Sequence, residues 1–540
     1  MNSAWPQPLD PLHSVALSAL AAALPLFLVL ILMGGLRKSG LFASFCGLIA
    51  AILLALVLWQ MPAVLVLWSA LYGMVYAIWP ILWIVFTALW LYNLTQDTGK
   101  FELFRRWMEQ HASADSSIQA VLVAFCFGAL LEGTAGFGAP VAVTACLLVG
   151  LGHPARRAVL VALIANTAPV AFGALGIPII ALAGVTGLDL AKLSAMAGRQ
   201  VPILSLLLPA YLIVVVSGTK GLRRNWPIAL VTGLSFALTQ FLVSNFWGPY
   251  IADVLASSIS ICATVLFLKI WSPGIPEFKP AESAPLAAPV ESPGAPLTAK
   301  ESFSAWLPWV MLSAVVVLWS WFRLLPLAQS ILPIPALHNG VLITLYQKPY
   351  AALYTFQPLG PGTAVLVATI ITALCLRVPG STFFHAGLKT LRQLRIPGLT
   401  VITVVALAYL YNYSGMAYTL GAAVARVGPS FPIFSGFLGW FACFLSGSDT
   451  ASNVLFGNLQ VAAAHQLHLS PILLAVTNSS GAVAGKMVSP QNIAVGVTTV
   501  GLIGQEGKVL RSAFWHSILL AAVVSLIALT QAYWLTWMVP

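Results

Sequence analysis

The stretch EGTAGFGAP, residues 132–140, lies between two runs of almost entirely apolar residues. It places a carboxylate (Glu132), three glycines and a proline where the flanking pattern predicts a continuous buried helix. Glycine and proline interrupt helices, and irregular backbone at membrane depth is tolerated only beside protein or a cavity. The stretch therefore predicts a break inside a membrane domain, at a place where a ligand can meet the backbone.

The whole chain has the composition of a membrane protein. Of its 540 residues, 60% are hydrophobic and only 7% are charged, whereas soluble domains average about 25% charged residues. A spanning helix needs about 20 apolar residues, and long continuous apolar runs exclude a β-barrel. We predict an all-α polytopic fold with about twelve transmembrane helices and two re-entrant hairpins. The expected spans lie near 12–33, 41–60, 62–96, 158–188, 198–217, 226–247, 249–269, 305–325, 362–377, 397–424, 471–503 and 513–537.

Two further apolar segments, 118–150 and 433–463, are broken by glycines and polar residues and fit no single crossing. Lysine and arginine mark cytoplasmic loops, and most of the 25 basic residues cluster between the spans. With these clusters in the cytoplasm and the N-terminus outside, 118–150 must enter and leave on the cytoplasmic side. Segment 433–463 must enter and leave on the outside. Each is predicted to be a re-entrant hairpin or a tight pair of crossings.

A proline-rich stretch, 271–304, is predicted to be a cytoplasmic linker. It separates a first membrane half, 1–270, from a second half, 305–540. The stretch 97–117 is predicted to be either an amphipathic helix on the inner surface or an ordinary connecting helix. The pattern assigns no structure to the outer loop 326–361.

The two halves repeat one order of elements in opposite directions. Hairpin 118–150 precedes a segment at 158–188 that glycine and proline break, and hairpin 433–463 precedes a broken segment at 471–503. This order predicts the inverted-topology repeat of secondary transporters, whose binding site lies at broken helices near the midplane. Broken helices leave N–H groups and a positive dipole end free, so four breaks that converge would bind a small anion.

Charged residues are rare inside the apolar segments. Of the fourteen acidic residues, only Glu132 and Asp449 are predicted to lie deep in the membrane, and Lys486 is the one basic residue expected there. Intramembrane charge costs at least about 2.5–3.5 kcal/mol, so each of the three predicts a function. Glu132 and Asp449 suit proton coupling. Lys486 could bind a substrate carboxylate, or pair with Asp449 or Glu132.

Three motifs identify a related family. LLEGTAGFGAPVAV (130–143), LSGSDTASNVLFGNLQ (445–460) and NSSGAVAGKMVSPQNIAVG (478–496) resemble the signature blocks of the L-lactate permease family. The resemblance extends over nearly the whole chain. It implies a multi-pass protein of the bacterial inner membrane that takes up L-lactate, D-lactate and glycolate by proton symport, without a cofactor.

A monocarboxylate requires a cationic or dipolar clamp and a few hydroxyl or amide partners. Besides Lys486, the candidates for substrate binding are Thr134, Asn166, Thr167, Ser446, Ser448, Thr450, Ser452, Asn453, Asn478, Ser479, Ser480, Gln491 and Asn492. In the resulting hypothesis, Glu132 or Asp449 carries the proton, and Lys486 with the hairpin N–H groups holds the carboxylate.

Alternative functions differ in what the sequence must contain. A sodium-coupled carboxylate transporter of the same architecture stays possible, because hydroxyl and carbonyl oxygens also coordinate Na⁺. A membrane enzyme would need a catalytic cluster, and a passive channel would carry no uphill flux. The six scattered cysteines predict no metal site, and no nucleotide motif or nucleic-acid partner is expected. The chain is predicted to be a transporter and not an enzyme, in a lipid bilayer, with its oligomeric state left open.

Overall fold

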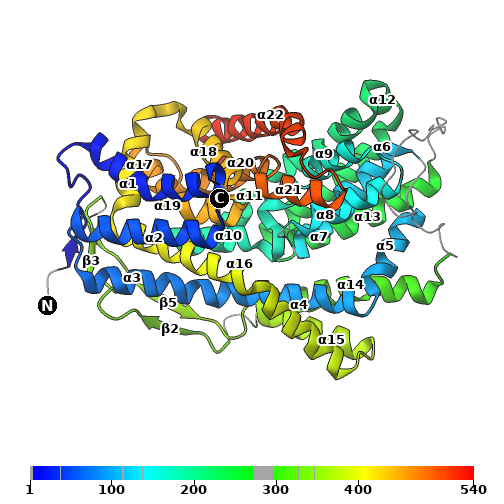
Figure 1. Ribbon diagram of the computed structural model, residues 1–540, viewed down its shortest axis with the longest axis horizontal. Coiled ribbons are helices and arrows are strands. Elements are labelled where there is room, and N and C mark those ends of the chain that lie inside the picture. Colours follow the sequence, from blue (N-terminus) through cyan, green and yellow to red (C-terminus); the bar gives the residue numbers. More distant parts are fainter. Residues whose placement is uncertain are drawn as a thin grey trace.

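A computed structural model describes residues 4–540 except 37, 112–114, 135, 137, 272–295, 323, 325–326 and 346. Most of the expected linker 271–304 therefore lies outside the described residues. The protein is built almost entirely of helices, and they run mainly along the longest axis of the molecule (Figure 1). The first half contains α1 (Val15–Leu30), η1 (Ile31–Gly35), α2 (Gly40–Val57), α3 (Ala63–Tyr76), η2 (Ala77–Leu82), α4 (Trp83–Asp97), α5 (Lys100–His111), α6 (Ser116–Gln119), η3 (Ala120–Phe127), α7 (Gly128–Thr134), α8 (Ala139–Gly150), α9 (Ala155–Ala165), η4 (Val170–Phe172), α10 (Gly173–Thr186), α11 (Leu190–Ala197), α12 (Val201–Phe246) and α13 (Ala252–Ile270).

The second half is shorter. Its helices are α14 (Ala299–Trp321), α15 (Pro361–Cys375), α16 (Gly380–Ser414), α17 (Met416–Val424), η5 (Ala425–Ser430), α18 (Phe431–Ser446), α19 (Asp449–Gln466), α20 (Pro471–Lys486), α21 (Pro490–Thr499), α22 (Glu506–Tyr533) and η6 (Thr536–Met538). The strands are β1 (Trp5–Pro6), β2 (Ser330–Pro333), β3 (Val341–Ile343), β4 (Lys348–Pro349) and β5 (Leu353–Phe356).

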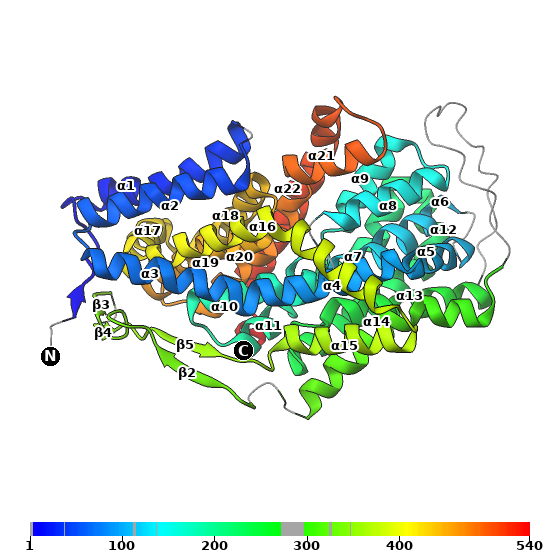
Figure 2. The ribbon, with the colours of Figure 1, turned by 60° about the horizontal axis from the view of Figure 1, so that its bottom comes forward.

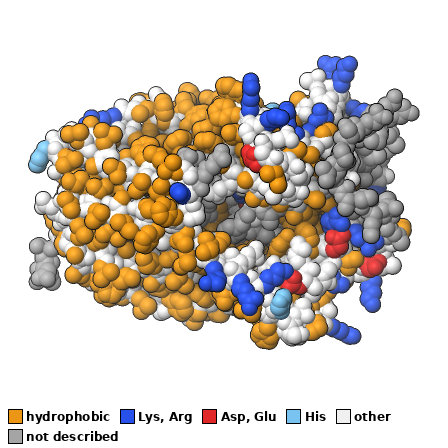
Figure 3. Space-filling view, viewed as in Figure 1, with side chains coloured by type: hydrophobic (Ala, Val, Ile, Leu, Met, Phe, Trp, Pro, Cys, Tyr) orange, Lys and Arg blue, Asp and Glu red, His pale blue; other side chains and the backbone are white. Residues whose placement is uncertain are grey.

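Within the described residues, ten helices are long and apolar enough to cross a membrane, and the bent pair α9–α10 makes an eleventh. This agrees with a polytopic membrane protein. The expected count of twelve differs partly because α12 joins two expected spans, 198–217 and 226–247, across a kink at Gly218 (φ 68°). It differs also because α15 has only 15 residues. In Figure 3, hydrophobic side chains cover the left half of the surface, and lysine and arginine gather on the right.

The first hairpin consists of α6, η3 and α7 going in and α8 coming out. Asp115 begins it, because its carboxylate accepts a hydrogen bond from the Ser117 N–H at 2.8 Å. Gly136 (φ 57°) and Gly138 (φ 84°) form the turn in the left-handed region, which only glycine adopts without strain. Pro140 then lies in the first turn of α8, where a missing N–H costs nothing. The motif that interrupts the apolar run is thus the tip of the hairpin.

The second hairpin consists of α18 and α19. Gly447 (φ 71°) ends α18 in the left-handed region, and the Ser448 hydroxyl caps α19 by accepting from the Ala451 N–H at 3.2 Å. This is the common glycine end and serine start of helices. The SGSD sequence therefore reverses the direction of the chain between α18 and α19.

Each hairpin is followed by a broken helix. In the first, α9 and α10 meet at 64°, and Ala174 (φ 44°) and Leu175 (φ 61°) adopt left-handed backbone beside the break. Such strain in residues other than glycine concentrates at functional sites. In the second, α20 ends at Lys486, and the Ser489 hydroxyl caps α21.

The two repeats approach the middle of the molecule from opposite ends. In Figures 1 and 2, α7, α8, α9 and α21 lie on the right of the centre, and α10, α18, α19 and α20 lie on the left. Each broken helix thus has one arm on either side, and both hairpin tips reach α21: a Cβ on Gly138 would meet Asn492, and one on Gly447 would meet Gln491. This is the arrangement expected of an inverted repeat.

Helices from both halves build a scaffold beside the hairpins. The long helix α16 packs against α2, α3 and α4. At Gly73 of α3 the backbones come so close that an added Cβ would lie 2.7 Å from the Ala406 Cα, as small residues allow in membrane helix packing. The halves are therefore interlocked in space although they are separate in sequence.

Two segments that the sequence left open have defined structures. The segment predicted to be an outer loop contains β2–β5, and β3 pairs in parallel with β1, which ties Trp5–Pro6 to this segment. Within 97–117, α5 forms and buries Phe104 and Met108. Its apolar face packs on α14, where Phe104 contacts Trp306 and Trp309.

Candidate functional site

A cavity of about 420 Å³ lies where the hairpin tips and the helix breaks meet. Its polar wall contains Glu132, Ser446, Ser448, Asp449, Thr450, Lys486, Gln491 and Asn492. The rest of its lining comes from Gly136, Gly138 and Gly447 at the hairpin tips, from Gly40 and Gly173, from Thr400 of α16, and from apolar residues of α1, η1, η2, α4, η4, α10, α16, α19 and α21.

The N-termini of four helices lie at this cavity. Gly138 at α8, Ile177 where the right-handed part of α10 begins, Ser448 at α19 and Gln491 at α21 all line it. The first N–H groups of a helix have no partner inside the helix, and the helix dipole is positive at that end. Four such ends around one space favour an anion.

An ion pair crosses between the repeats at one end of the cavity. The Lys486 Nζ on α20 donates to the Glu132 Oε1 on α7 at 2.6 Å, and both side chains are buried. The Asn166 Nδ2, just after α9, donates to the Glu132 Oε2 at 3.2 Å. The glutamate is therefore bound by one cation and one amide, each from a different broken helix.

The glutamate also depends on a glycine. A Cβ on Gly173 would lie 2.8 Å from the Glu132 Oε1 and 3.2 Å from its Cγ. The start of α10 thus leaves just enough room for the carboxylate to reach Lys486.

Asp449 lies at the start of α19, on the second hairpin, and has a different environment. Its Oδ2 accepts from the Ser479 hydroxyl at 2.8 Å, and its buried Oδ1 has no hydrogen-bond partner among the described residues. Lys486 pairs with Glu132 and not with Asp449. The two acids of the repeat are therefore not equivalent in their partners.

A buried amide and hydroxyl network supports Asp449 from behind. The Asn453 Nδ2 donates to the Ser479 Oγ at 3.0 Å and to the Pro178 carbonyl at 3.1 Å. The Asn478 Nδ2 donates to the Ser452 Oγ and the Asn453 Oδ1. This network fastens α20 and α10 to the second hairpin and fixes the position of Asp449.

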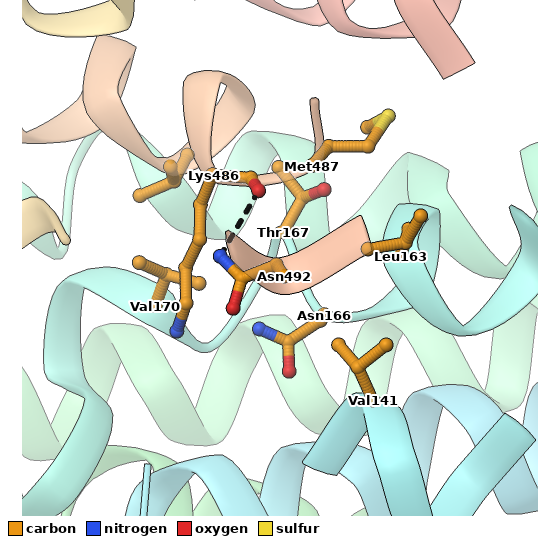
Figure 4. A pocket seen from close by; sticks show the side chains of 9 residues that line it. Val141, Leu163, Asn166, Thr167, Val170, Lys486, Met487 and Asn492 are labelled. Carbon is orange, nitrogen blue, oxygen red and sulfur yellow. Dashed lines mark hydrogen bonds between the residues drawn. The ribbon is translucent and has the colours of Figure 1, made fainter. Parts of the chain in front are cut away.

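Next to Lys486 is a small polar recess that shares Val170, Lys486 and Asn492 with the cavity. Figure 4 shows the Lys486 side chain extending past Val170 and the Asn492 side chain directed toward Lys486, to whose carbonyl its Nδ2 donates at 3.2 Å. The buried Asn166 Oδ1 and Thr167 Oγ1 have no partner among the described residues. Buried polar atoms are nearly always hydrogen-bonded, but the recess has no room for a water molecule, so these two groups stay unpaired in this conformation.

The comparisons with known proteins give the family. A family model described as L-lactate permease matches residues 18–535. The chain belongs to the L-lactate permease family. It is 41% identical to "Glycolate permease GlcA" of Escherichia coli K12, over 99% of both chains. It is 38% identical to an L-lactate permease of the same strain and 39% identical to one of Bacillus subtilis 168, in each case over 99% of this chain and 100% of the relative.

Among solved structures, Neisseria gonorrhoeae MtrF, described as one of a class of antimetabolite efflux pumps, resembles this chain with a TM-score of 0.45 and 13% identity. The match covers 84% of this chain and 81% of MtrF. The family match makes the chain a multi-pass membrane permease, which is a transporter and not an enzyme.

The permease fold divides the residues expected at the site into two groups. Besides the eight that line the cavity, Asn166 and Thr167 line the recess. Six others, however, face neither space: Thr134, Ser452, Asn453, Asn478, Ser479 and Ser480. Thr134 donates to the Leu130 carbonyl of its own helix at 2.8 Å.

Asn166 and Asn478, which lie in the two broken segments, do not occupy equivalent places. Asn166 lies at the break after α9, whereas α20 continues through Asn478 for another two turns and ends at Lys486. Lys486 is thus the residue that occupies the corresponding break, and Asn478 and Ser479 hydrogen-bond to α19 instead.

One buried acid was missed. Asp253 was expected near a span end, but it is fully buried in the first turn of α13, and its Oδ1 accepts from the Gln240 Nε2 at 2.7 Å. An added Cβ on Gly133 would lie 3.0 Å from the Asp253 Cβ, so α13 packs directly behind Glu132. The available signal was the polar Gln240 inside an apolar span. Asp253 lies outside both the cavity and the recess.

Proposed function

We propose that the permease carries small 2-hydroxy monocarboxylates, namely L-lactate, D-lactate and glycolate, together with a proton. The names of its relatives, lactate and glycolate permeases at 38–41% identity, support this substrate class. The observation that carries the coupling is the buried Lys486–Glu132 ion pair at the cavity.

The cavity offers the groups that such a substrate requires. Lys486 and the four helix N-termini attract one carboxylate. The unpartnered Asn166 Oδ1 and Thr167 Oγ1 lie beside Lys486 in the closed recess, and a widening of the recess would let them bond a 2-hydroxyl group. Asp449 lines the same cavity, and its buried Oδ1 also has no hydrogen-bond partner among the described residues.

Proton coupling follows from competition for Lys486. Without substrate, Lys486 is neutralised by Glu132. When Glu132 takes up a proton, it can release Lys486, and the substrate carboxylate can replace it. The pair and its replacement have the same net charge, so the loaded and the empty site are equally neutral.

Binding of the carboxylate or the proton alone is energetically unfavourable. A carboxylate that enters without a proton adds an uncompensated negative charge to a buried site, and a proton without a carboxylate leaves Lys486 uncompensated. Burying an unpaired charge costs several kcal/mol. The site therefore favours zero or two ligands over one, which is the condition for tight symport.

The test uses purified protein in liposomes and radiolabelled L-lactate. An inward proton gradient is expected to drive accumulation in sodium-free buffer, and unlabelled glycolate is expected to compete. Accumulation that requires a sodium gradient and ignores the proton gradient would assign the chain to sodium-coupled transport. Equilibration without accumulation under either gradient would assign it to passive flux.

A further inference from the structure

The cavity is larger than its charged end requires. Its volume of about 420 Å³ falls in the range of about 300–1,000 Å³ that pockets for drug-sized ligands occupy. The polar lining is concentrated on the hairpin tips, α20 and α21, whereas α1, η2, α4 and α16 contribute mainly apolar side chains. The cavity therefore has a charged end and an apolar wall.

Five aliphatic side chains form the buried part of this wall. They are Val29 of α1, Ile81 of η2, Val85 of α4, and Val404 and Val405 of α16. Each is less than 9% exposed, so they face the cavity and not the lipid. A ligand as small as glycolate, held at Lys486, leaves most of such a wall without a contact.

We infer that this site also accepts, as transported substrates, aliphatic 2-hydroxy acids with longer side chains, up to the size of 2-hydroxyisocaproate. This inference rests on the proposed function. The carboxylate binds at Lys486, and the side chain lies on the apolar wall. Burying one methylene group favours binding by up to about fourfold, so affinity should hold or rise along the series from glycolate.

The first experiment is a competition and exchange series in proteoliposomes. Glycolate, lactate, 2-hydroxybutyrate, 2-hydroxyisovalerate and 2-hydroxyisocaproate each compete with labelled L-lactate uptake. Each is then loaded inside the vesicles to accelerate entry of labelled lactate by exchange. The expected result is that 2-hydroxyisocaproate inhibits at least as well as lactate and also drives exchange.

The second experiment tests whether the substrate's side chain contacts the apolar wall. Val404→Phe and Ile81→Phe fill the apolar side of the cavity, and Leu399→Phe on the lipid-exposed side of α16 is the matched control. The measured quantity is the half-inhibitory concentration of 2-hydroxyisocaproate divided by that of glycolate. We expect this ratio to rise at least tenfold in the two wall variants and to stay within twofold in the control.

Three results would overturn the inference while lactate uptake itself is intact. The first is inhibition that falls steadily with side-chain length, and the second is inhibition without exchange. The third is an equal ratio in the wall variants and the control. Absent lactate uptake would instead contradict the proposed function, so the two failures can be told apart.

Discussion

Lys486 and Glu132 lie 354 positions apart in the chain and form a buried ion pair of 2.6 Å that joins the two repeats. Each residue stands at a break: Glu132 near the tip of the first hairpin and Lys486 at the end of α20. The pair therefore depends on the relative position of the two repeats. Whatever neutralises Glu132 changes both the charge of the site and the bond between the repeats.

Glu132→Gln should uncouple the permease and not simply inactivate it. Glutamine imitates the protonated acid, so Lys486 is permanently available to a substrate carboxylate. We expect lactate–lactate exchange to persist and to lose its dependence on pH between 5.5 and 7.5, while accumulation driven by a proton gradient falls to background. Exchange and accumulation are both measured with labelled lactate in proteoliposomes.

Asp253→Asn is the matched control for that variant, because Asp253 is a buried acid packed behind Glu132 but outside the cavity. It should retain gradient-driven accumulation within about threefold of the parent protein. Loss of coupling in Asp253→Asn with normal coupling in Glu132→Gln would move the proton from Glu132 to Asp253.

The ion pair also predicts a specific pattern of stabilities. Removing one partner of a buried pair costs about 3–5 kcal/mol, because the other charge remains uncompensated. Lys486→Met should therefore lower the melting temperature in detergent, and Glu132→Gln added to it should restore much of the loss. Neither protein should transport lactate against a gradient. An additive decrease in the double variant would show that the two charges do not interact.

The sequence predicted the architecture well because its signals are local. Glycine, proline and capping serine residues mark the hairpin tips at 136–140 and 447–448, and these signals do not depend on how the helices pack against one another. The sequence could not decide which acid pairs with Lys486. Glu132 and Asp449 were both candidates, and only the packing of the hairpins decides between them.

The sequence also could not show whether the polar residues on α20 face the cavity or hydrogen-bond to neighbouring helices. Asn478 and Ser479 have the composition of a binding motif, but α19 supplies Asn453 and Asp449 as partners inside the protein. The sequence did not predict the apolar wall either. Its residues come from four separate segments, and each of them resembles an ordinary core residue.

His153, which lies outside the membrane helices, predicts that the folded protein loses stability in acid. It lies in the turn between α8 and α9, where burial and the nearby Arg157 lower its pKa to about 4, and its Nε2 lies 3.0 Å from the Gln119 Oε1. An unfolded histidine has a pKa near 6.5, so the unfolded chain binds more protons as pH falls from 6.5 to 4. Stability should fall over that window by up to about 3 kcal/mol.

His153→Gln tests this contribution. The melting temperature in detergent, followed from pH 7 to pH 4, should fall less steeply in the variant than in the parent protein. Equal slopes would show that His153 is not held neutral by its surroundings.

Gly173→Ala should separate the position of Glu132 from its charge. The added methyl group would lie 2.8 Å from the Glu132 Oε1, and the carboxylate cannot yield without moving away from Lys486. We expect lactate uptake to fall at least tenfold with both charges still present. Gly507→Ala in the first turn of α22, where an added Cβ meets nothing within 4 Å, is the control and should be neutral or slightly stabilising. Normal uptake in Gly173→Ala would mean that the carboxylate has another place to go, and that its contact with Lys486 is not required for transport.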